Sequence, residues 1–176
     1  MANSYIYLVA SLPMLHFGAK PPFSFERFLE LCSGLVSEPD KELLERSRSL
    51  EVFPSASSGL SAFRAWLSFE TALRNELIKI RASRIHSDAQ RYLRQDVSSE
   101  VSLTHIALAA HRNPSMVEAE KFLDQQRWQK LEEIAWGHYF DMVVLVSYAQ
   151  RLLILERWER IRNAHASELL EEALTR

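Results

Sequence analysis

The sequence is poor in the residues that interrupt helices, with only four glycines and six prolines in 176 residues. Low contents of both favour helices and argue against a β fold that is rich in turns. The glycines are also too far apart to form a phosphate-binding loop or a dinucleotide-binding fingerprint. We therefore expect an all-α protein without a recognisable nucleotide-binding motif.

Cysteine and metal-binding patterns are equally scarce. Cys32 is the only cysteine, so no intramolecular disulfide can form, and a reducing compartment is the simplest explanation. Its place on an apolar helix face predicts a packing residue rather than a nucleophile. No Glu-x-x-His or HExxH pattern occurs, and His105 and His111 are six apart, which does not place them on one helix face. We expect no metal and no cofactor, and the sequence offers no catalytic constellation.

No hydrophobic run reaches the roughly 18 residues that span a bilayer, because Gln150 and Arg151 interrupt the best candidate. The net charge of −2 gives no bulk attraction to nucleic acid or to anionic membranes. The apolar content of 47% and the charged content of 25% are ordinary for a globular protein. We expect one domain over residues 1–176, with no nucleic-acid partner and with any membrane contact peripheral.

The most apolar stretch, residues 140–161, predicts the central helix of the fold. It contains no glycine or proline, begins at a plausible N-cap, Asp141, and is about six turns long. Further apolar residues widen its main face until little of the circumference is polar, and such a helix is usually surrounded by others. The main face comprises Val144, Leu145, Tyr148, Leu152 and Leu155.

Start and stop signals bound the other helices. Ser24 is expected to cap a helix that ends near residue 35, and Pro39 to begin a second short helix. Asn113 is expected to cap a later helix with Pro114 at its first position, and Gly137 to end that helix in a left-handed conformation. Further helices are expected over residues 61–85, 89–95 and 103–110.

The N-terminal run of residues 5–12 is compatible with two structures. Its aromatic and β-branched residues suit a strand, which could pair with residues 52–53, but a short apolar run suits a buried helical turn equally well. The fold class is therefore an all-α helical bundle around a long central helix, with this segment as the only candidate for extended structure.

Charged residues fall inside two apolar stripes. On the helix over residues 61–85, Glu70, Arg74 and Arg81 lie within the apolar arc, and Glu70 and Arg74 have the i, i+4 spacing of a favourable ion pair. On the helix after Asn113, Glu120 and Arg127 lie within the stripe. That stripe is formed by Met116, Leu123, Leu131 and Ile134.

Buried charges are costly unless they are paired, so two interpretations stay open. In the first, Glu70 and Glu120 pair with the three arginines in an internal network. In the second, these residues line a polar cleft or docking surface, where Arg74 and Arg81 bind an anion such as a carboxylate or phosphate.

The four tryptophans are expected in the core or half-buried. Two of them exposed together would instead mark an interface with another protein. The residues concerned are Trp66, Trp128, Trp136 and Trp158.

Several stretches together resemble an uncharacterised bacterial family whose genes accompany those of V-type (A/V-type) ATPases. They are YIYLVASLPML, PPFSFERFLELC, AFRAWLSFETALRNEL, NPSMVEAEKFLDQQRW and LEEIAWGHYFDMVVLVSYAQRLLILERWE, and the likeness extends from Tyr5 to about Leu174. The chain is also distantly similar to the C subunit of V-type ATPases, a helical protein that joins the central stalk to the membrane ring. That similarity lies in residues 5–12 and in a late pattern of Phe140, Asp141, Leu145 and Tyr148.

The resemblance implies a non-catalytic accessory or stalk-associated protein of a V-type ATPase. Its partners would be ATPase subunits on the stalk or rotor side, and the protein would be cytoplasmic, reaching the membrane only through its partner. The alternative is a small-molecule or anion-binding helical protein with an arginine-lined cleft. The candidate network or docking residues are Glu70, Arg74, Arg81, Glu120, Arg127, His138, Asp141 and Arg157.

Overall fold

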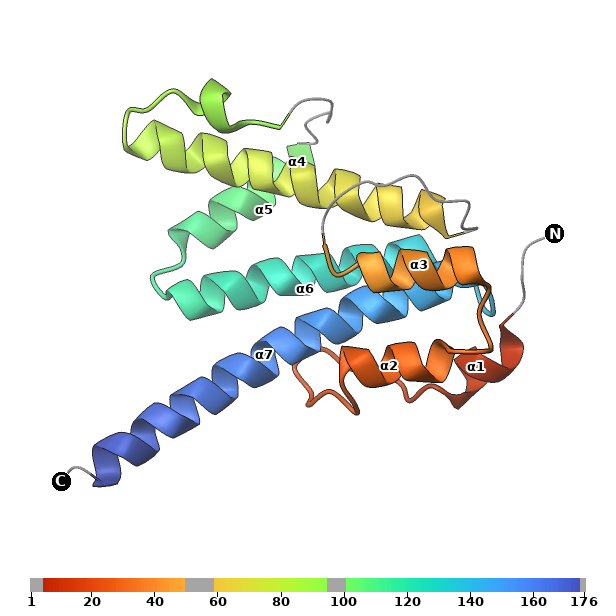
Figure 1. Ribbon diagram of the computed structural model, residues 1–176. Helices are drawn as coiled ribbons and strands as arrows, with labels where there is room; N and C mark the ends of the chain where they lie inside the picture. Colours follow the sequence, from red (N-terminus) through yellow and green to blue (C-terminus); the bar gives the residue numbers. More distant parts are fainter. Residues whose placement is uncertain (1–4, 50–58, 95–100, 175–176) are drawn as a thin grey trace. The chain divides into compact units, whose positions relative to one another are not determined.

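The computed structural model of the protein describes residues 5–49, 59–94 and 101–174 (Figure 1). In these ranges the chain forms seven α-helices and one short 3-10 helix, and no strand occurs among them. The predicted all-α fold class is confirmed. None of the helices described is long and apolar enough to cross a membrane.

The chain divides into two compact units. Unit 1 consists of Met1–Leu60 and Ala135–Arg176, and unit 2 consists of Ser61–Ile134. Unit 2 is therefore continuous in sequence, whereas unit 1 is assembled from the two ends of the chain. The expectation of one domain over residues 1–176 stays a prediction.

Unit 1 is built around one long helix, α7 (Met142–Leu174), which begins where the sequence predicts. The Oδ1 atom of Asp141 accepts hydrogen bonds from the backbone N–H groups of Val143 at 3.1 Å and Val144 at 3.3 Å. This carboxylate therefore caps α7. With 33 residues, α7 is about 50 Å long.

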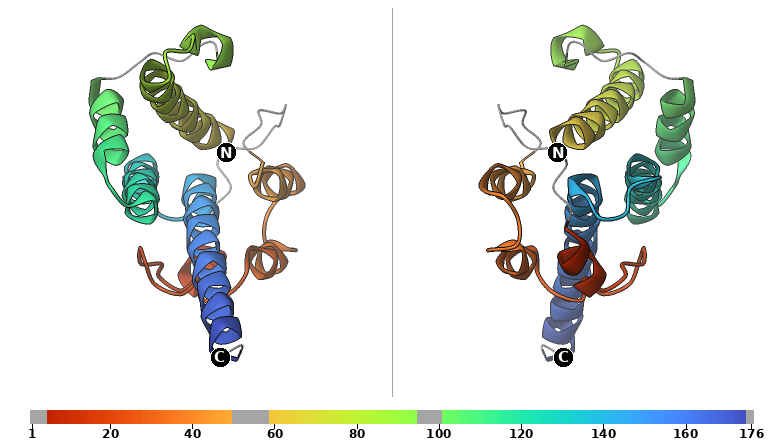
Figure 2. Two further views of the ribbon diagram at one scale, coloured as in Figure 1. Left: turned by 90° about the vertical axis from the view of Figure 1, so that its left-hand side faces the viewer. Right: turned by 90° about the vertical axis from the view of Figure 1, so that its right-hand side faces the viewer.

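The first half of α7 is buried around most of its circumference. Leu145 and Leu152 are fully buried on the main face, and Val143 and Ile154 are buried on the other side. The helices α2 (Phe25–Cys32) and α3 (Glu38–Arg46) pack against α7 and against each other. In Figure 2 they lie along one side of α7, with the loop that precedes α2 on the other side.

The N-terminal run forms a short helix, α1 (Ile6–Ser11), so the strand alternative is wrong for the residues described. The backbone N–H of Tyr5 donates to the carbonyl oxygen of Phe140 at 2.7 Å, and its hydroxyl donates to buried Asp40 on α3. Asp40 also accepts a hydrogen bond from the Ser37 hydroxyl at 2.9 Å. These contacts tie the start of α1 to both α3 and the turn before α7. The proposed pairing partner, residues 52–53, lies outside the described residues.

Unit 2 contains α4 (Leu60–Arg84), the 3-10 helix η1 (Ala89–Tyr92), α5 (Val101–Arg112) and α6 (Met116–Ala135). The first residue of α4 and the last residue of α6 are counted with unit 1. The three α-helices share one apolar core, which extends outward through partly buried Phe69, Leu77, Ile106 and Phe122. Its buried members are Ala72, Leu73, Leu103, Ala110 and Leu123.

A buried asparagine on α4 holds the segment that follows η1. The side chain of Asn75 donates to the carbonyl oxygen of Arg94 at 2.9 Å and accepts from its N–H at 3.0 Å. The Asn75 side chain therefore satisfies both backbone hydrogen-bonding groups of Arg94, as the backbone of a neighbouring β-strand would. The helical path breaks between α4 and η1, where His86 has φ 50, as the sequence predicts.

The start of α6 differs from the prediction. The helix begins at Met116, and the Ser115 hydroxyl caps it by accepting from the N–H of Glu118 at 3.3 Å. The Asn113 side chain instead accepts from the N–H of Ser115 at 3.0 Å, which is the two-residue turn that asparagine side chains often form. Gly137 has φ 80 just after α6, as predicted.

Gly59 provides a test of how tightly unit 1 is packed. A Cβ atom at this position would lie 2.5 Å from Cγ of Met142, 3.1 Å from Val146 and 3.2 Å from Leu43. Because these three side chains are buried, we expect Gly59→Ala to lower the free energy of unfolding by about 1–3 kcal/mol. Urea midpoints measure this loss, with Ser61→Ala at an exposed position as control. Equal midpoints for the two variants would show that the packing around Gly59 adapts.

Candidate functional site

In unit 2 an arginine on α6 is held between two acids. Arg127 donates from Nε to Oε1 of Glu70 at 2.7 Å and from Nη1 to Oδ1 of Asp124 at 2.9 Å. The exposed side-chain fractions of Arg127, Glu70 and Asp124 are 17%, 12% and 1%. Burial alone would lower the pKa of Arg127, but the charges and hydrogen bonds of the two carboxylates raise it. The structure therefore brings Glu70 and Arg127 together.

Arg74 and Arg81 are both exposed on α4, so of the two interpretations the buried internal network does not extend to them. Glu70 accepts from Arg127 on α6, so the expected i, i+4 pairing with Arg74 is replaced by a contact between helices. Arg74 and Arg81 lie towards one edge of the apolar arc. From there a long side chain reaches water past its apolar neighbours.

Arg81 and Glu120 line a cavity of about 590 Å³ within unit 2, where α4 and α5 end and α6 begins. Arg84 and His111 line the same cavity, together with apolar side chains. Arg74 is not part of the lining. The cavity therefore brings Arg81 together with Arg84 and not with Arg74, and the binding of an anion by Arg74 and Arg81 stays a prediction.

In unit 1 a group of large apolar side chains is exposed on two adjacent segments, which we call the aromatic surface. One segment is the start of α1 and the other is the turn before α7, and the hydrogen bond from Tyr5 to Phe140 joins them. The surface comprises Ile6, Tyr7, Trp136, Tyr139 and Phe140, with exposed fractions of 58%, 77%, 87%, 72% and 43%.

Trp136 corrects the expectation that all four tryptophans are core or half-buried. Trp66 and Trp128 are buried and Trp158 is half-buried, whereas Trp136 is the most exposed large apolar residue among those described. It follows the last residue of α6 and precedes Gly137, so it projects from the turn instead of the helix.

His138 and Asp141, two predicted docking residues, lie within this turn. The Nδ1 atom of His138 is 2.5 Å from Oδ2 of Asp141, while Oδ1 of Asp141 caps α7. The backbone N–H of His138 also donates to the carbonyl oxygen of Ala135 at 3.0 Å. These contacts hold the turn that carries Trp136, Tyr139 and Phe140.

Arg157, another predicted docking residue, lines a groove of about 840 Å³ between α2 and α7. Its guanidinium lies 5.8 Å from the ring centroid of the adjacent Trp158, so these neighbours do contact each other. The acids of the groove are engaged locally. Glu156 accepts from the N–H of Phe25 at 2.7 Å, and Glu26 pairs with Arg48 at 2.5 Å.

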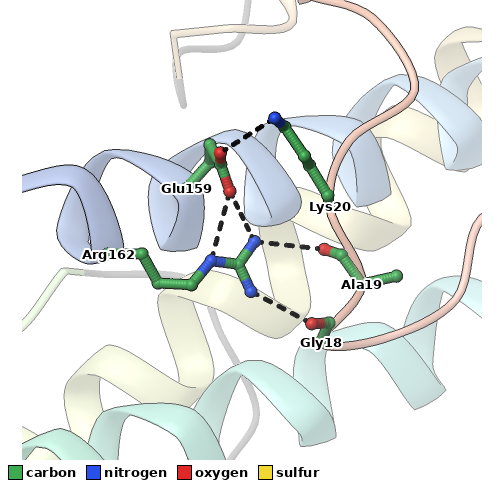
Figure 3. Close-up of polar contacts among 5 residues, drawn as sticks. All are labelled: Gly18, Ala19, Lys20, Glu159 and Arg162. Atoms are coloured by element: carbon green, nitrogen blue, oxygen red, sulfur yellow. Dashed lines mark hydrogen bonds and ion pairs between the residues drawn. The ribbon is translucent and has the colours of Figure 1, made fainter. Parts of the chain in front are cut away.

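The third acid of the groove, Glu159, takes part in fixing the loop before α2 (Figure 3). It pairs with Arg162 at 2.7 Å and with Lys20 at 3.8 Å. Arg162 in turn donates to the carbonyl oxygens of Gly18 at 3.1 Å and Ala19 at 3.4 Å. Charged residues of α7 therefore hold the loop before α2 in place, whereas apolar residues nearer the start of α7 pack against α2 and α3.

Besides Asp40 in unit 1, two buried acids of unit 2 were missed from the sequence. Asp124 lies one turn before Arg127, so the i, i+3 spacing was a usable signal. Glu76 on α4 is 4% exposed and accepts from the Thr104 hydroxyl of α5 at 2.9 Å, with Lys79 at 2.6 Å as its ion-pair partner. The i, i+3 spacing of Glu76 and Lys79 also predicts their ion pair. It does not predict the hydrogen bond between Glu76 and Thr104, because Thr104 lies on another helix.

The remaining titratable groups offer little for metal or thiol chemistry. No group of three or more His, Cys, Asp or Glu residues in the described part of the chain is placed to hold a metal ion. Cys32 is 0% exposed, and burial raises the pKa of its thiol to about 12.

The fold and these surfaces define an all-helical protein with an exposed aromatic surface and a separate amphipathic cavity. The model of a family described as a protein of unknown function, DUF2764, matches residues 102–176, which include α6, α7 and the turn between them. This match supports the expected likeness to an uncharacterised family over that part of the chain. No curated protein and no solved structure matches the chain.

Substituting Arg127 tests the contribution of the charge cluster in unit 2. Arg127→Met removes a cationic partner from both Glu70 and Asp124, so we expect the free energy of unfolding to fall by about 3 kcal/mol. Arg74→Met, on the exposed side of α4, is the control and should change stability by less than about 0.5 kcal/mol. Indistinguishable urea midpoints for the two variants would exclude a stabilising role for the cluster.

The thiol of Cys32 should be unreactive in the folded protein. Because the thiolate is the nucleophile and the folded-state pKa is about 12, a disulfide reagent at about pH 8 should label Cys32 only after unfolding in urea. The pKa is raised from 9.0, so the associated stability is fully present below pH 9.0 and is lost as the pH rises towards 12. Labelling of the native protein at the rate of the unfolded chain would contradict this prediction.

Proposed function

We propose that the protein is a non-catalytic interaction module that docks through its aromatic surface onto a V-type ATPase, on the stalk or rotor side. In this proposal it is cytoplasmic and reaches the membrane only through its partner. The observation that carries the proposed docking role is the exposure of Ile6, Tyr7, Trp136, Tyr139 and Phe140 on adjoining segments of unit 1.

The composition of this surface favours a protein partner. Tryptophan and tyrosine are the residues that most often dominate the energetics of protein interfaces, because each offers a large apolar area and one polar atom. Trp136 and Tyr7 are 87% and 77% exposed, which leaves apolar area in contact with water. A partner that covers these rings would remove that area from water.

The surface is also held in place before any partner binds. Gly137 supplies the left-handed turn, Asp141 binds both His138 and the first N–H groups of α7, and Tyr5 anchors α1 to Phe140. A surface that is already ordered loses less conformational entropy on binding than a flexible one. His138 and Asp141 therefore act in docking by positioning the turn.

The identity of the partner rests on the sequence resemblance to the family encoded with V-type ATPase genes and to the C subunit of these ATPases. The match to the DUF2764 family model, which names no partner, covers residues 102–176 and includes three of the five residues of the aromatic surface, Trp136, Tyr139 and Phe140. A second candidate function, anion binding, is favoured by the cavity that Arg81 and Arg84 line in unit 2.

A pull-down with matched variants tests the docking proposal. Tagged parent protein, the double variant Tyr7→Ala/Trp136→Ala and the control Tyr92→Ala would each be expressed in the native host, and co-purifying chains identified by mass spectrometry. Tyr92 is 60% exposed, belongs to unit 2 and is not one of the residues of the aromatic surface. We expect ATPase subunits with the parent and the control, and a loss of at least about tenfold with the double variant, because both apolar anchors are removed.

The salt dependence of the pull-down provides a second criterion. Contacts of apolar rings are not screened, so recovery should persist at high ionic strength. Thermal unfolding of the double variant should match the parent, since both substituted residues are exposed. Recovery of the bait alone from the parent strain would contradict the choice of partner, and full recovery with the double variant would contradict the choice of surface.

A further inference from the structure

The lining of the cavity in unit 2 combines charged and apolar side chains. Its basic side chains are those of Arg81 and Arg84 from the last turn of α4 and of His111 from the last turn of α5. Its apolar side chains include Leu77, Ile80 and Leu123, of which Leu123 belongs to the buried core. The volume of about 590 Å³ lies within the range that small-molecule sites occupy.

Two large apolar side chains lie at this cavity without being covered by protein. Ile85 is 72% exposed and Met116 is 82% exposed, and both belong to the lining. They extend the apolar part of the lining towards solvent. An apolar chain lying against them would remove that area from water, which is favourable because burying apolar surface is the main driving force of association.

The charges of the lining favour an anion. The lining contains two guanidinium groups, of Arg81 and Arg84, and one carboxylate, of Glu120, so its fixed charge is positive even with His111 neutral. The start of α6 is also part of the lining, through Pro114 and Met116, and the N-terminal end of a helix carries partial positive charge. Guanidinium groups suit carboxylate and phosphate because they can donate two parallel hydrogen bonds.

We propose that this cavity binds an amphiphilic anion, with an alkyl or acyl chain against Leu77 and Ile80 and one carboxylate or phosphate head group against Arg81 and Arg84. The site lies in unit 2 and uses no residue of the aromatic surface, so it is independent of the docking proposal. Glu120 lies in the same lining and disfavours a second negative charge, which selects for a head group of low charge.

Basic residues in the last turn of a helix also stabilise the helix by interacting with its dipole. This role accounts for Arg81, Arg84 and His111 without any ligand, and it makes a different prediction. If the arginines only stabilise α4, replacing them lowers the melting temperature and has no effect on ligand affinity. If they bind a head group, affinity falls and the preference for charged over neutral ligands is lost.

Calorimetric titration of the full chain with decanoate tests the proposal, with decanol as the neutral analogue and acetate as the head group alone. We expect decanoate to saturate one site. Decanol lacks the charged head group and acetate lacks the alkyl chain, so each should bind at least about tenfold more weakly. Decyl phosphate, titrated in parallel, identifies the preferred head group.

Three variants and one control assign the residues. Arg81→Gln/Arg84→Gln should lower the affinity for decanoate at least about tenfold, whereas Arg64→Gln, an exposed arginine of α4 outside the cavity, should leave it within about twofold. Ala119→Trp should block the cavity, with thermal unfolding confirming that the variant is folded. Glu120→Gln should tighten binding because it removes a negative charge near the head group.

The proposal is overturned if neither decanoate nor decyl phosphate binds saturably. Binding of decanol as tight as that of decanoate would also overturn it, because it would indicate a purely apolar surface. Binding of acetate as tight as that of decanoate would overturn it too, because it would indicate a simple anion site. Unchanged affinity in the double arginine variant would assign these residues to helix stabilisation only. Weaker binding by Glu120→Gln would show that the head group lies elsewhere.

Discussion

Unit 1 depends on the burial of the first half of α7. Between Asp141 and Arg151 this helix carries no charged residue, and its side chains from Met142 to Leu155 are mostly withdrawn from water. Each fully buried aliphatic side chain contributes roughly 1.5–3 kcal/mol relative to an exposed one. The short helices α1, α2 and α3 could not persist alone, since isolated helices below about 12 residues are marginal in water. α2 and α3 are stable because α7 offers them an apolar surface, and hydrogen bonds of Tyr5 tie α1 to α3 and to the turn before α7.

Beyond Leu155 the same helix changes the interactions that it makes. Glu156 accepts from the first N–H of α2, and Glu159 and Arg162 bind the loop from Gly18 to Lys20. Apolar burial along the first half of α7 holds α2 and α3 against it. The polar contacts beyond Leu155 hold the start of α2 and the loop before it, whose backbone groups need hydrogen-bond partners. The sequence pattern of α7 thus divides unit 1 into an apolar part and a polar part.

Much of this fold is predictable because it depends on local signals. The central helix, its Asp141 cap, the Ser24 cap of α2 and the left-handed Gly137 follow from composition and capping preferences. The cap of α6 was misplaced because Asn113 and Ser115 are both good caps, and only the structure shows which one the helix uses.

The charged residues were predicted less well, since their partners lie on other helices. Helical spacing placed Glu70 beside Arg74, but spacing along one helix carries no information about Arg127, which is 57 residues away. The residues that line the cavity were likewise only partly predictable from the sequence. Arg81 was identified, whereas Arg84 and His111 join it only because α4 and α5 end at the same place. The exposure of Trp136 likewise depends on the turn in which it lies, and tryptophan as a residue type predicts burial.

The division of the chain into units has a consequence for biosynthesis. Unit 2 is a continuous segment inserted between the two parts of unit 1, so all of its residues leave the ribosome before α7 does. Domains generally fold as units during synthesis, and contacts distant in sequence form late because they close long loops. The apolar faces of α2 and α3 that pack against α7 therefore stay exposed to solvent until α7 has been synthesised. Exposed Phe25, Phe28 and Leu43 make the nascent chain the kind of species that chaperones bind, and a chain that ends before Leu155 would lack part of the surface that buries them.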